Sequence, residues 1–240
     1  MKLSTRLAHF MSGAILVFVL PSLATAQGKI IFQDDFQRAE SDDKLEEVGN
    51  GWTTNSKKRA KGVKQVDLVD GSMHITRAKV ADHGVSVVQD LKFRDAIIEM
   101  RFKIGPKDDL GINIADMKEK SVHAGHICMT RIRSTSVEIN DLKMGKMNLE
   151  TRQRRLDDKL TDEDQKRLKT KTTRVKAKIS PDQWHQLKVQ VENNTMTVSV
   201  DGKPLAKFSS EGIGHATKSR LRLAVNKSAW VDDVKVTRLR

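Results

Sequence analysis

The chain has 240 residues, a formal net charge of +13 and a single cysteine. One cysteine excludes a disulfide within the chain, and its position in an apolar strand-like run predicts that Cys128 is a buried, unreactive thiol. The strong positive charge favours polyanionic partners such as acidic polysaccharides. Nucleic acid is not expected, because the aromatic-rich basic motifs of RNA-binding domains are missing and the chain carries an export signal.

The first 26 residues have the organisation of a cleavable secretory signal peptide. Lys2 and Arg6 precede an apolar run over 8–20, and Ala24-Thr25-Ala26 has the small-x-small pattern that signal peptidase accepts. A membrane anchor is the alternative, but Pro21 ends the run short of the roughly 20 apolar residues that a spanning helix needs. We therefore predict cleavage after Ala26, a secreted or periplasmic location, no membrane span after cleavage, and one domain over 27–240.

Apolar and polar residues alternate with a period of two through most of this domain. Dipeptides with turn chemistry, such as Asp70-Gly71, Asn193-Asn194 and Asp201-Gly202, separate the runs. The alternation predicts strands near 63–69, 72–77, 85–91, 94–104, 110–115, 126–132, 135–140, 184–192, 196–200, 203–208, 219–225 and 229–239. Because few of these runs are separated by helical patterns, we predict an all-β fold, an antiparallel β-sandwich of the jelly-roll type.

The alternation is interrupted by a helical pattern near 147–170. Thr161 and Asp164 have the spacing of a capping box, which predicts a short helix beginning at residue 162. From 152 to 178 there are eleven Lys or Arg residues and five Asp or Glu residues. This charged, partly helical insertion over 147–178 is either an anion-binding arm or a solvated excursion whose charges provide solubility, and charge runs favour the second interpretation.

Five short motifs resemble the concanavalin A-like lectin/glucanase superfamily. They are Phe32-Gln33-Asp34-Asp35-Phe36, Gly51-Trp52, Trp184-His185-Gln186-Leu187-Lys188-Val189, Asp201-Gly202-Lys203 and Trp230-Val231-Asp232-Asp233-Val234-Lys235-Val236. The similarity is closest to secreted domains of the 3-keto-disaccharide hydrolase type, also called domain of unknown function 1080, and spans about 30–240 outside the insertion. It implies that the first and last strands lie side by side, that the sheets curve, and that carbohydrate is the ligand class.

The same resemblance implies a Ca²⁺ ion away from the sugar-binding face. Asp35 and Asp232, with Asp34 and Asp233 next to them, would supply the oxygen ligands that Ca²⁺ prefers. The alternative is that these carboxylates accept backbone N–H groups at strand ends. Adjacent aspartates in one strand point to opposite faces, which favours the alternative.

The sequence argues against the ordinary chemistry of retaining glucanases. Glucanases of this fold carry Glu-x-Asp-x-x-Glu on one strand, and the nearest approach here, Glu138-Ile139-Asn140-Asp141, lacks the second Glu. The chain also has Asp109-Leu110-Gly111 where the 3-keto-disaccharide hydrolase type carries an Asn-Ser-Gly strand start. Both departures favour binding over turnover.

Polar side chains on neighbouring strand-like runs form the best candidate site in the middle of the domain. The predicted ligand-binding residues are Asn113, His123, His126, Arg131, Arg133 and Glu138, and His126 and Glu138 are the candidates for a catalytic acid and base. The alternative is an ordinary solvent-facing sheet surface. Two functions stay open: an exported domain that binds carbohydrate without turnover, and a glycoside hydrolase or lyase of the 3-keto-disaccharide hydrolase type.

Overall fold

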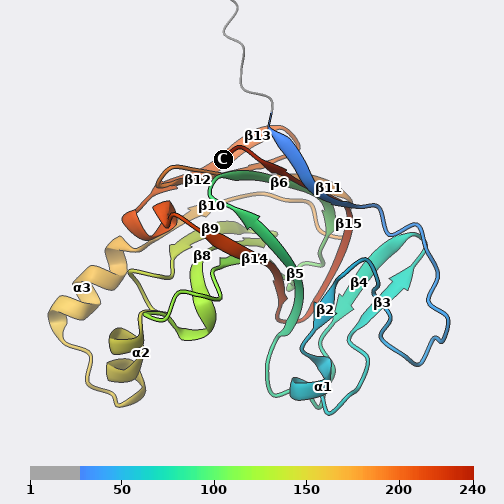
Figure 1. The fold of residues 1–240 in the computed structure, drawn as a ribbon, viewed down its shortest axis with the longest axis horizontal. Coiled ribbons are helices and arrows are strands. Elements are labelled where there is room, and N and C mark those ends of the chain that lie inside the picture. The colour runs from blue at the N-terminus through green and yellow to red at the C-terminus, as the bar shows by residue number, and fades with distance from the viewer. Residues whose placement is uncertain (1–27) are drawn as a thin grey trace, which may run out of the picture.

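The computed structural model describes residues 28–240, and the predicted signal peptide over 1–26 lies outside this part of the chain. Two antiparallel sheets, of eight and seven strands, pack face to face (Figure 1). The predicted antiparallel β-sandwich is therefore confirmed.

The eight-stranded sheet joins both ends of the described chain. Its strands are β1 (Lys29–Asp34), β3 (Val66–Val69), β4 (Ser72–Thr76), β6 (Ala96–Lys103), β11 (His185–Glu192), β12 (Thr195–Val200), β13 (Lys203–Ser209) and β15 (Ser228–Arg238). They follow the order β13-β12-β11-β6-β15-β4-β3, and β1 pairs with the C-terminal half of β15. The first and last strands thus lie side by side, as the resemblance implied.

The seven-stranded sheet comes mainly from the middle of the chain. Its strands are β2 (Thr53–Thr54), β5 (Val85–Phe93), β7 (Leu110–Ala115), β8 (His126–Arg133), β9 (Ser136–Asp141), β10 (Thr172–Lys176) and β14 (Lys218–Val225). Their order is β10-β9-β8-β7-β14-β5-β2. Each strand predicted from alternation is present in one of the two sheets, with boundaries that differ by a few residues.

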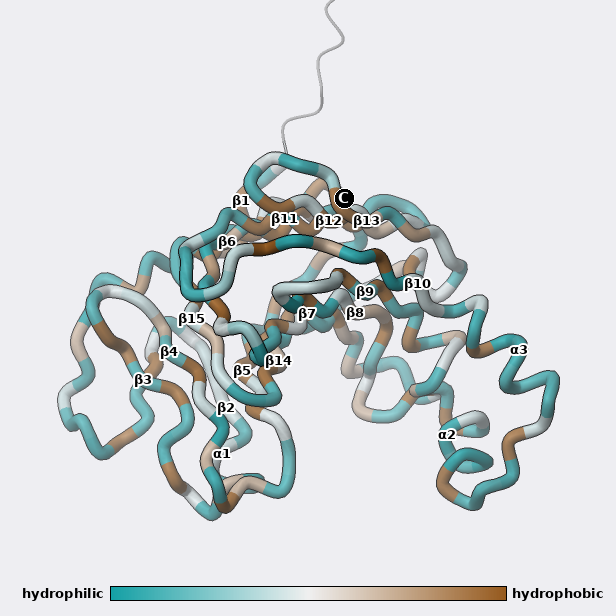
Figure 2. Tube along the Cα trace, turned by 180° about the vertical axis from the view of Figure 1, so that it is seen from behind, coloured by the Kyte–Doolittle hydropathy of each residue, from teal (hydrophilic) through white to brown (hydrophobic). Residues whose placement is uncertain are grey.

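Helical structure is confined to short segments. The α-helices are α1 (Ser56–Arg59), α2 (Leu149–Leu156) and α3 (Asp162–Thr170), and the 3₁₀ turns are η1 (His123–Gly125) and η2 (Glu211–Gly214). Figures 1 and 2 show α2 and α3 extending from one side of the sandwich, and α1 with β2, β3 and β4 from the other. No helix within residues 28–240 is long and apolar enough to cross a membrane.

The hairpin turns form where the sequence predicted them. Asp70, Asn193 and Asp201 have φ angles of 50°, 53° and 50°, and the glycines after Asp70 and Asp201 also have positive φ. Asp, Asn and Gly tolerate this left-handed backbone better than other residues, and turns of this kind match the twist of the flanking strands. The turn residues therefore fix the register of the hairpins that they connect.

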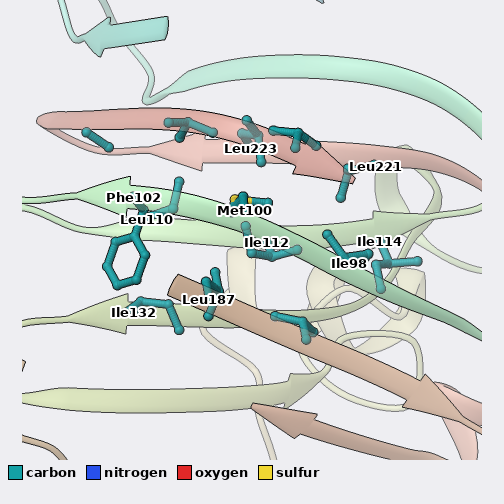
Figure 3. Packing of buried hydrophobic residues seen from close by; sticks show 14 of the residues in the cluster. Ile98, Met100, Phe102, Leu110, Ile112, Ile114, Ile132, Leu187, Leu221 and Leu223 are labelled. Carbon is teal, nitrogen blue, oxygen red and sulfur yellow. The ribbon is translucent and has the colours of Figure 1, made fainter. Parts of the chain in front are cut away.

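One hydrophobic core fills the space between the sheets. Leu110, Ile112 and Ile114 alternate along β7, are fully buried, and meet Ile98 and Met100 of β6 from the opposite sheet (Figure 3). Because strand side chains alternate between faces, the residues between them lie on the outer face of the seven-stranded sheet. The candidate site residues belong to this second set.

Cys128 is part of the core. Its side chain is fully buried, and burial raises the pKa of the thiol to about 12. A thiol that stays protonated and enclosed is a poor nucleophile. The predicted burial of Cys128 is confirmed, and its low reactivity stays a prediction.

The charged insertion is helical over most of its length, as predicted. Thr161 Oγ1 accepts from the backbone N–H of Asp164 at 3.1 Å, and Asp164 Oδ2 accepts from the Thr161 N–H, so the predicted capping box is confirmed. Asp164 also accepts from Arg154 and Arg167, which ties α2 to α3. The last part of the predicted insertion, 172–176, is instead the edge strand β10, because its alternating residues pair with β9.

Candidate functional site

Polar side chains form a row across four neighbouring strands on the outer face of the seven-stranded sheet. Backbone pairing places Asn113 of β7 between Arg222 of β14 and Met129 of β8, and Asn140 of β9 on the far side of Met129. Figure 1 shows that the α2–α3 arm and the α1–β4 region extend on either side of this sheet. The row therefore lies on a face flanked by two projecting parts of the fold.

A second row lies two residues further along the same strands. Arg131 of β8 pairs with Gly111 of β7 and with Glu138 of β9, and Glu138 pairs with Arg174 of β10. A Cβ atom added to Gly111 would lie 3.3 Å from Nη2 of Arg131, so the glycine leaves room for the guanidinium to cross β7. Met129 connects the rows, since its sulfur lies 3.9 Å from Arg131 Nη2.

Two side chains of the first row, Asn113 and Arg222, are in direct contact with His126 at the start of β8. Arg222 Nη1 donates to Asn113 Oδ1 at 3.1 Å, and Nδ1 of His126 lies 3.0 Å from both of these atoms. A neutral imidazole with a proton on Nδ1 donates to Asn113, and one with a lone pair on Nδ1 accepts from Arg222. One tautomer cannot make both bonds, so the choice of tautomer decides which neighbour is released for a ligand.

The imidazole of His126 is neutral at ordinary pH. Burial, together with the positive charge of Arg222, lowers its pKa to about 3. Burial also lowers the pKa of Arg222 to about 10, so the guanidinium stays charged at neutral pH. A neutral imidazole of such low pKa can accept a hydrogen bond but is a weak base, while the arginine beside it can hold an anionic or hydroxyl oxygen.

The second row contains ion pairs and hydrogen bonds between its own residues. Arg131 pairs with Asp109, which also accepts two hydrogen bonds from Asn226. Asn140 Nδ2 donates to Glu138 Oε1 at 2.9 Å. These contacts hold Arg131 and Glu138 in fixed positions on the outer face.

Two buried donors on the outer face of this sheet have no hydrogen-bond acceptor within residues 28–240. They are Nδ2 of Asn113 and Nη1 of Arg133, and the latter lies 3.8 Å from Glu138 Oε2, beyond hydrogen-bond distance. A buried donor without a partner costs roughly 1–3 kcal/mol. A ligand that supplies oxygen acceptors would recover that free energy once side-chain movement exposes the two nitrogens, which are enclosed in this structure.

Further basic residues surround the two rows. The pKa of Lys146 is lowered by burial and by the nearby charges of Arg131 and Arg155, although Glu138 acts in the opposite direction. Burial and the charge of Arg152 lower the pKa of His123. Since Arg152 and Arg155 belong to α2, the charged insertion adds positive potential to this face of the sheet.

The structure brings the predicted ligand-binding residues onto one face or its edge. The imidazole of His126 is in contact with the side-chain amide of Asn113. His123, in η1, lies nearby, with its ring centre 6.4 Å from that of His126. Arg131 and Glu138 belong to the second row, and Arg133 lies two residues further along β8, opposite Ser136. Their roles in binding or catalysis stay predictions.

Sequence reasoning missed Arg222, Arg174 and Lys146. Arg222 is one polar residue of an alternating run, and only the non-local pairing of β14 with β7 places it beside Asn113. Thr130 of β8 is polar but faces the core, where its hydroxyl donates to the backbone carbonyl of Glu138. The bulge between β7 and β8 shifts the residues before Thr130 relative to simple alternation.

Asp34 of the opening motif is engaged in an ion pair with Arg38. Asp34 accepts from both terminal nitrogens of Arg38, from Trp52 Nε1 at 2.8 Å and from the Phe36 N–H. Burial alone would raise its pKa, but the bonds from Arg38, Phe36 and Trp52 outweigh that effect and lower it. This carboxylate holds an arginine, a tryptophan and a backbone turn together, and no oxygen is left over for a metal.

Asp232 of the closing motif has a similar arrangement. It accepts from Arg101 Nη1 at 2.9 Å and from the Asp233 N–H, while Asp35 is exposed. Within residues 28–240 no three His, Cys, Asp or Glu side chains are grouped so that they could hold a metal ion. The donor set thus does not fit Ca²⁺, and the assignment of Asp35 and Asp232 to a calcium site stays an unsupported prediction.

Solved structures with the same fold include proteins that act on or recognise sugars. A non-specific endo-β-1,3(4)-glucanase has a TM-score of 0.58 at 13% identity, with 90% of this chain and 97% of that chain covered. A protein of unknown function with a galectin-like fold from Bacillus subtilis has 0.57 at 12% identity, covering 88% and 97%. The carbohydrate recognition domain of Emp47p has 0.53 at 13% identity, covering 88% and 97%. At these identities the likeness concerns the fold.

No curated protein matches the sequence. The family assignment rests instead on residues 42–237, which match the 3-keto-alpha-glucoside-1,2-lyase-like domain. This match spans most of both sheets, including the two rows of the outer face. The chain belongs to the 3-keto-alpha-glucoside-1,2-lyase-like domain family.

Proposed function

We propose that this chain is an exported domain that binds a carbohydrate, without turnover, on the outer face of its seven-stranded sheet. The observation that carries the proposal is the pair of buried donors without acceptors, Asn113 Nδ2 and Arg133 Nη1. Sugar hydroxyl and ring oxygens are suitable acceptors for both. Membership of a family named for a glucoside supports carbohydrate as the ligand class.

The surplus of positive charge favours an acidic polysaccharide among carbohydrate ligands. Arg222, Lys146 and the α2 arginines all contribute to the potential over the outer face. Arginine binds carboxylate and sulfate groups in a planar, two-pronged geometry. Binding to such a glycan should weaken as salt is added, because the charges involved are partly exposed.

A paired substitution tests the binding proposal. Asn113→Asp keeps the shape of the side chain and replaces the unpartnered donor with an acceptor, while the new carboxylate can pair with Arg222. Asn194→Asp makes the same chemical change in an exposed turn of the eight-stranded sheet and is the matched control. A glycan array identifies a ligand, and calorimetry then compares the variants.

Loss of one donor to the ligand should weaken binding by about tenfold in Asn113→Asp and by less than about twofold in the control. If the two variants bound the glycan with equal affinity, the ligand would not bind at Asn113 on the outer face of the seven-stranded sheet. Failure of neutral and acidic polysaccharides alike to bind the unmodified protein would overturn the function itself.

A lyase is the second candidate function. The position of His126, whose Nδ1 lies 3.0 Å from Arg222 Nη1, favours it, although a pKa of about 3 makes this imidazole a weak base. In a 3-keto-glucoside the carbonyl acidifies the C2–H bond. His126 would take that proton, the C–H electron pair would form the C1=C2 double bond, and the C1–O bond would break with its electrons leaving on oxygen, which takes a proton from water. Arg222 would stabilise the enolate oxygen formed on the way.

Incubation with 3-keto-glucosides, followed by mass spectrometry of the products, separates the two functions. A lyase gives an unsaturated sugar and the released alcohol, and His126→Gln abolishes both. Product no greater than in the buffer control rules out the lyase and leaves the binding function standing.

A further inference from the structure

A second basic site lies where several strands end, away from the two rows. A cavity of about 480 Å³ is lined by the end of β5, the segment after β7, the start of β14 and the C-terminal end of β15. Six of its eleven lining residues are Lys or Arg, and one is acidic.

Four of these cations are free to meet a ligand. Lys92, Arg94, Lys118 and Arg238 are exposed, and within residues 28–240 their side chains make no ion pair or hydrogen bond. Arg240, by contrast, is neutralised by the fully buried carboxylate of Asp95. Like charges held close together repel one another, so the free cations gain when an anion lies between them.

Lys218 lies beneath this group and is almost completely buried. Its Nζ donates to the backbone carbonyls of Arg94 at 2.7 Å and His215 at 2.8 Å. An ammonium group has three N–H donors, so one is not used by these carbonyls. Burial lowers the pKa of Lys218, and an anion in the cavity would offset that cost by stabilising the charged form.

The one acidic residue of the lining does not neutralise the cavity. Asp116 accepts from Thr217 Oγ1, His215 Nε2 and the Lys118 N–H. Burial would raise its pKa, but these bonds lower it to about 2. The carboxylate of Asp116 is therefore already bound by Thr217, His215 and the Lys118 N–H. The net charge of the residues that line the cavity stays strongly positive.

We propose that this cavity is a second anion-binding site, which takes a sugar residue carrying a sulfate or carboxylate group. The volume lies in the range of roughly 300–1,000 Å³ that is usual for small-molecule sites and exceeds what a bare inorganic anion needs. Ala216, which is exposed, adds a small apolar surface beside the charged groups. Arg94 and Arg238 supply the guanidinium groups for the oxyanion.

The test uses three disaccharides: one sulfated unit from heparin, one diuronate and neutral cellobiose. Binding to the purified protein is followed by amide NMR at 92–94 and 216–219. Arg94→Gln with Arg238→Gln removes two free cations without touching a packed side chain. Lys188→Gln with Lys207→Gln removes two exposed lysines of the eight-stranded sheet and is the charge-matched control.

The sulfated unit, the diuronate or both should bind saturably with shifts at these amides, and cellobiose should not. The arginine pair should weaken that binding by about tenfold, and the lysine pair by less than about twofold. Equal weakening by both pairs would show general charge attraction and overturn the site. So would saturable cellobiose binding at the same amides, or no saturable binding of either anionic unit.

This inference is separate from the proposed function. Asn113→Asp changes the outer face and should leave the shifts at 216–219 intact. If the protein binds glycan on the outer face of the seven-stranded sheet but shows no chemical-shift change at these amides, the second site is refuted and the proposed function is not.

Discussion

Replacing His126 by Gln should change how the stability of the protein depends on pH. The imidazole has an ordinary pKa of 6.5 in an unfolded chain, and burial with Arg222 lowers it to about 3 in the folded state. At pH values between about 3 and 6.5, the imidazole is protonated in the unfolded state and neutral in the folded state. The free energy of unfolding contributed by this residue therefore falls as pH falls, by about 1.4 kcal/mol per unit.

The magnitude at accessible pH follows from the same numbers. Between pH 8 and pH 5, His126 should lower the free energy of unfolding of the wild-type protein by about 2 kcal/mol. His126→Gln cannot titrate, and its amide can still meet Arg222 and Asn113. The variant should therefore be close to wild type at pH 8 and gain about 2 kcal/mol relative to it at pH 5.

Urea unfolding followed by the fluorescence of the three tryptophans measures this difference. His185→Gln serves as a control of opposite sign. Burial alone would lower the pKa of His185, but its bond to Asp201 raises it above the ordinary value, so its stabilisation is complete below the unfolded pKa and is lost as pH rises. A His126→Gln difference that stays constant within about 0.5 kcal/mol from pH 8 to pH 5 would refute the desolvated, neutral imidazole.

Three further outcomes are expected. Asp34→Ala should lower the free energy of unfolding by about 3–5 kcal/mol, because it leaves Arg38 and Trp52 without their shared acceptor, and Asp35→Ala should change it by less than about 0.5 kcal/mol; similar urea midpoints for the two variants would contradict the ion-pair account. Cys128 should resist a thiol reagent until urea unfolds the protein, and fast labelling of the native state would count against its burial. Expression in a secreting host should yield a chain whose intact mass begins after Ala26, whereas recovery of the unprocessed mass would refute the signal peptide.

Strand positions were predictable from the sequence because their signals are local. Alternation needs only neighbouring residues, and the turns at Asp70, Asn193 and Asp201 need only side chains that tolerate positive φ. The capping box of α3 is equally local. These features therefore agree with the structure to within a few residues.

The composition of the site was only partly predictable, because it depends on which strands become neighbours. β14 lies next to β7 although about a hundred residues separate them, as the register of Arg222 with Asn113 shows. The calcium assignment stays a prediction, and the partners of its aspartates were hidden from the sequence for a related reason. Asp34 accepts hydrogen bonds from Arg38 and from Trp52, which is distant in the sequence. A motif of adjacent aspartates does not indicate either of these partners.

The central claim is that the outer face of the seven-stranded sheet binds carbohydrate, and mapping a glycan by NMR tests it most directly. Titration with the best ligand from a glycan array should shift the amides of β7, β8 and β14, with the largest changes around Asn113, His126 and Arg222. Shifts confined to the eight-stranded sheet, or none with any glycan, would contradict the account.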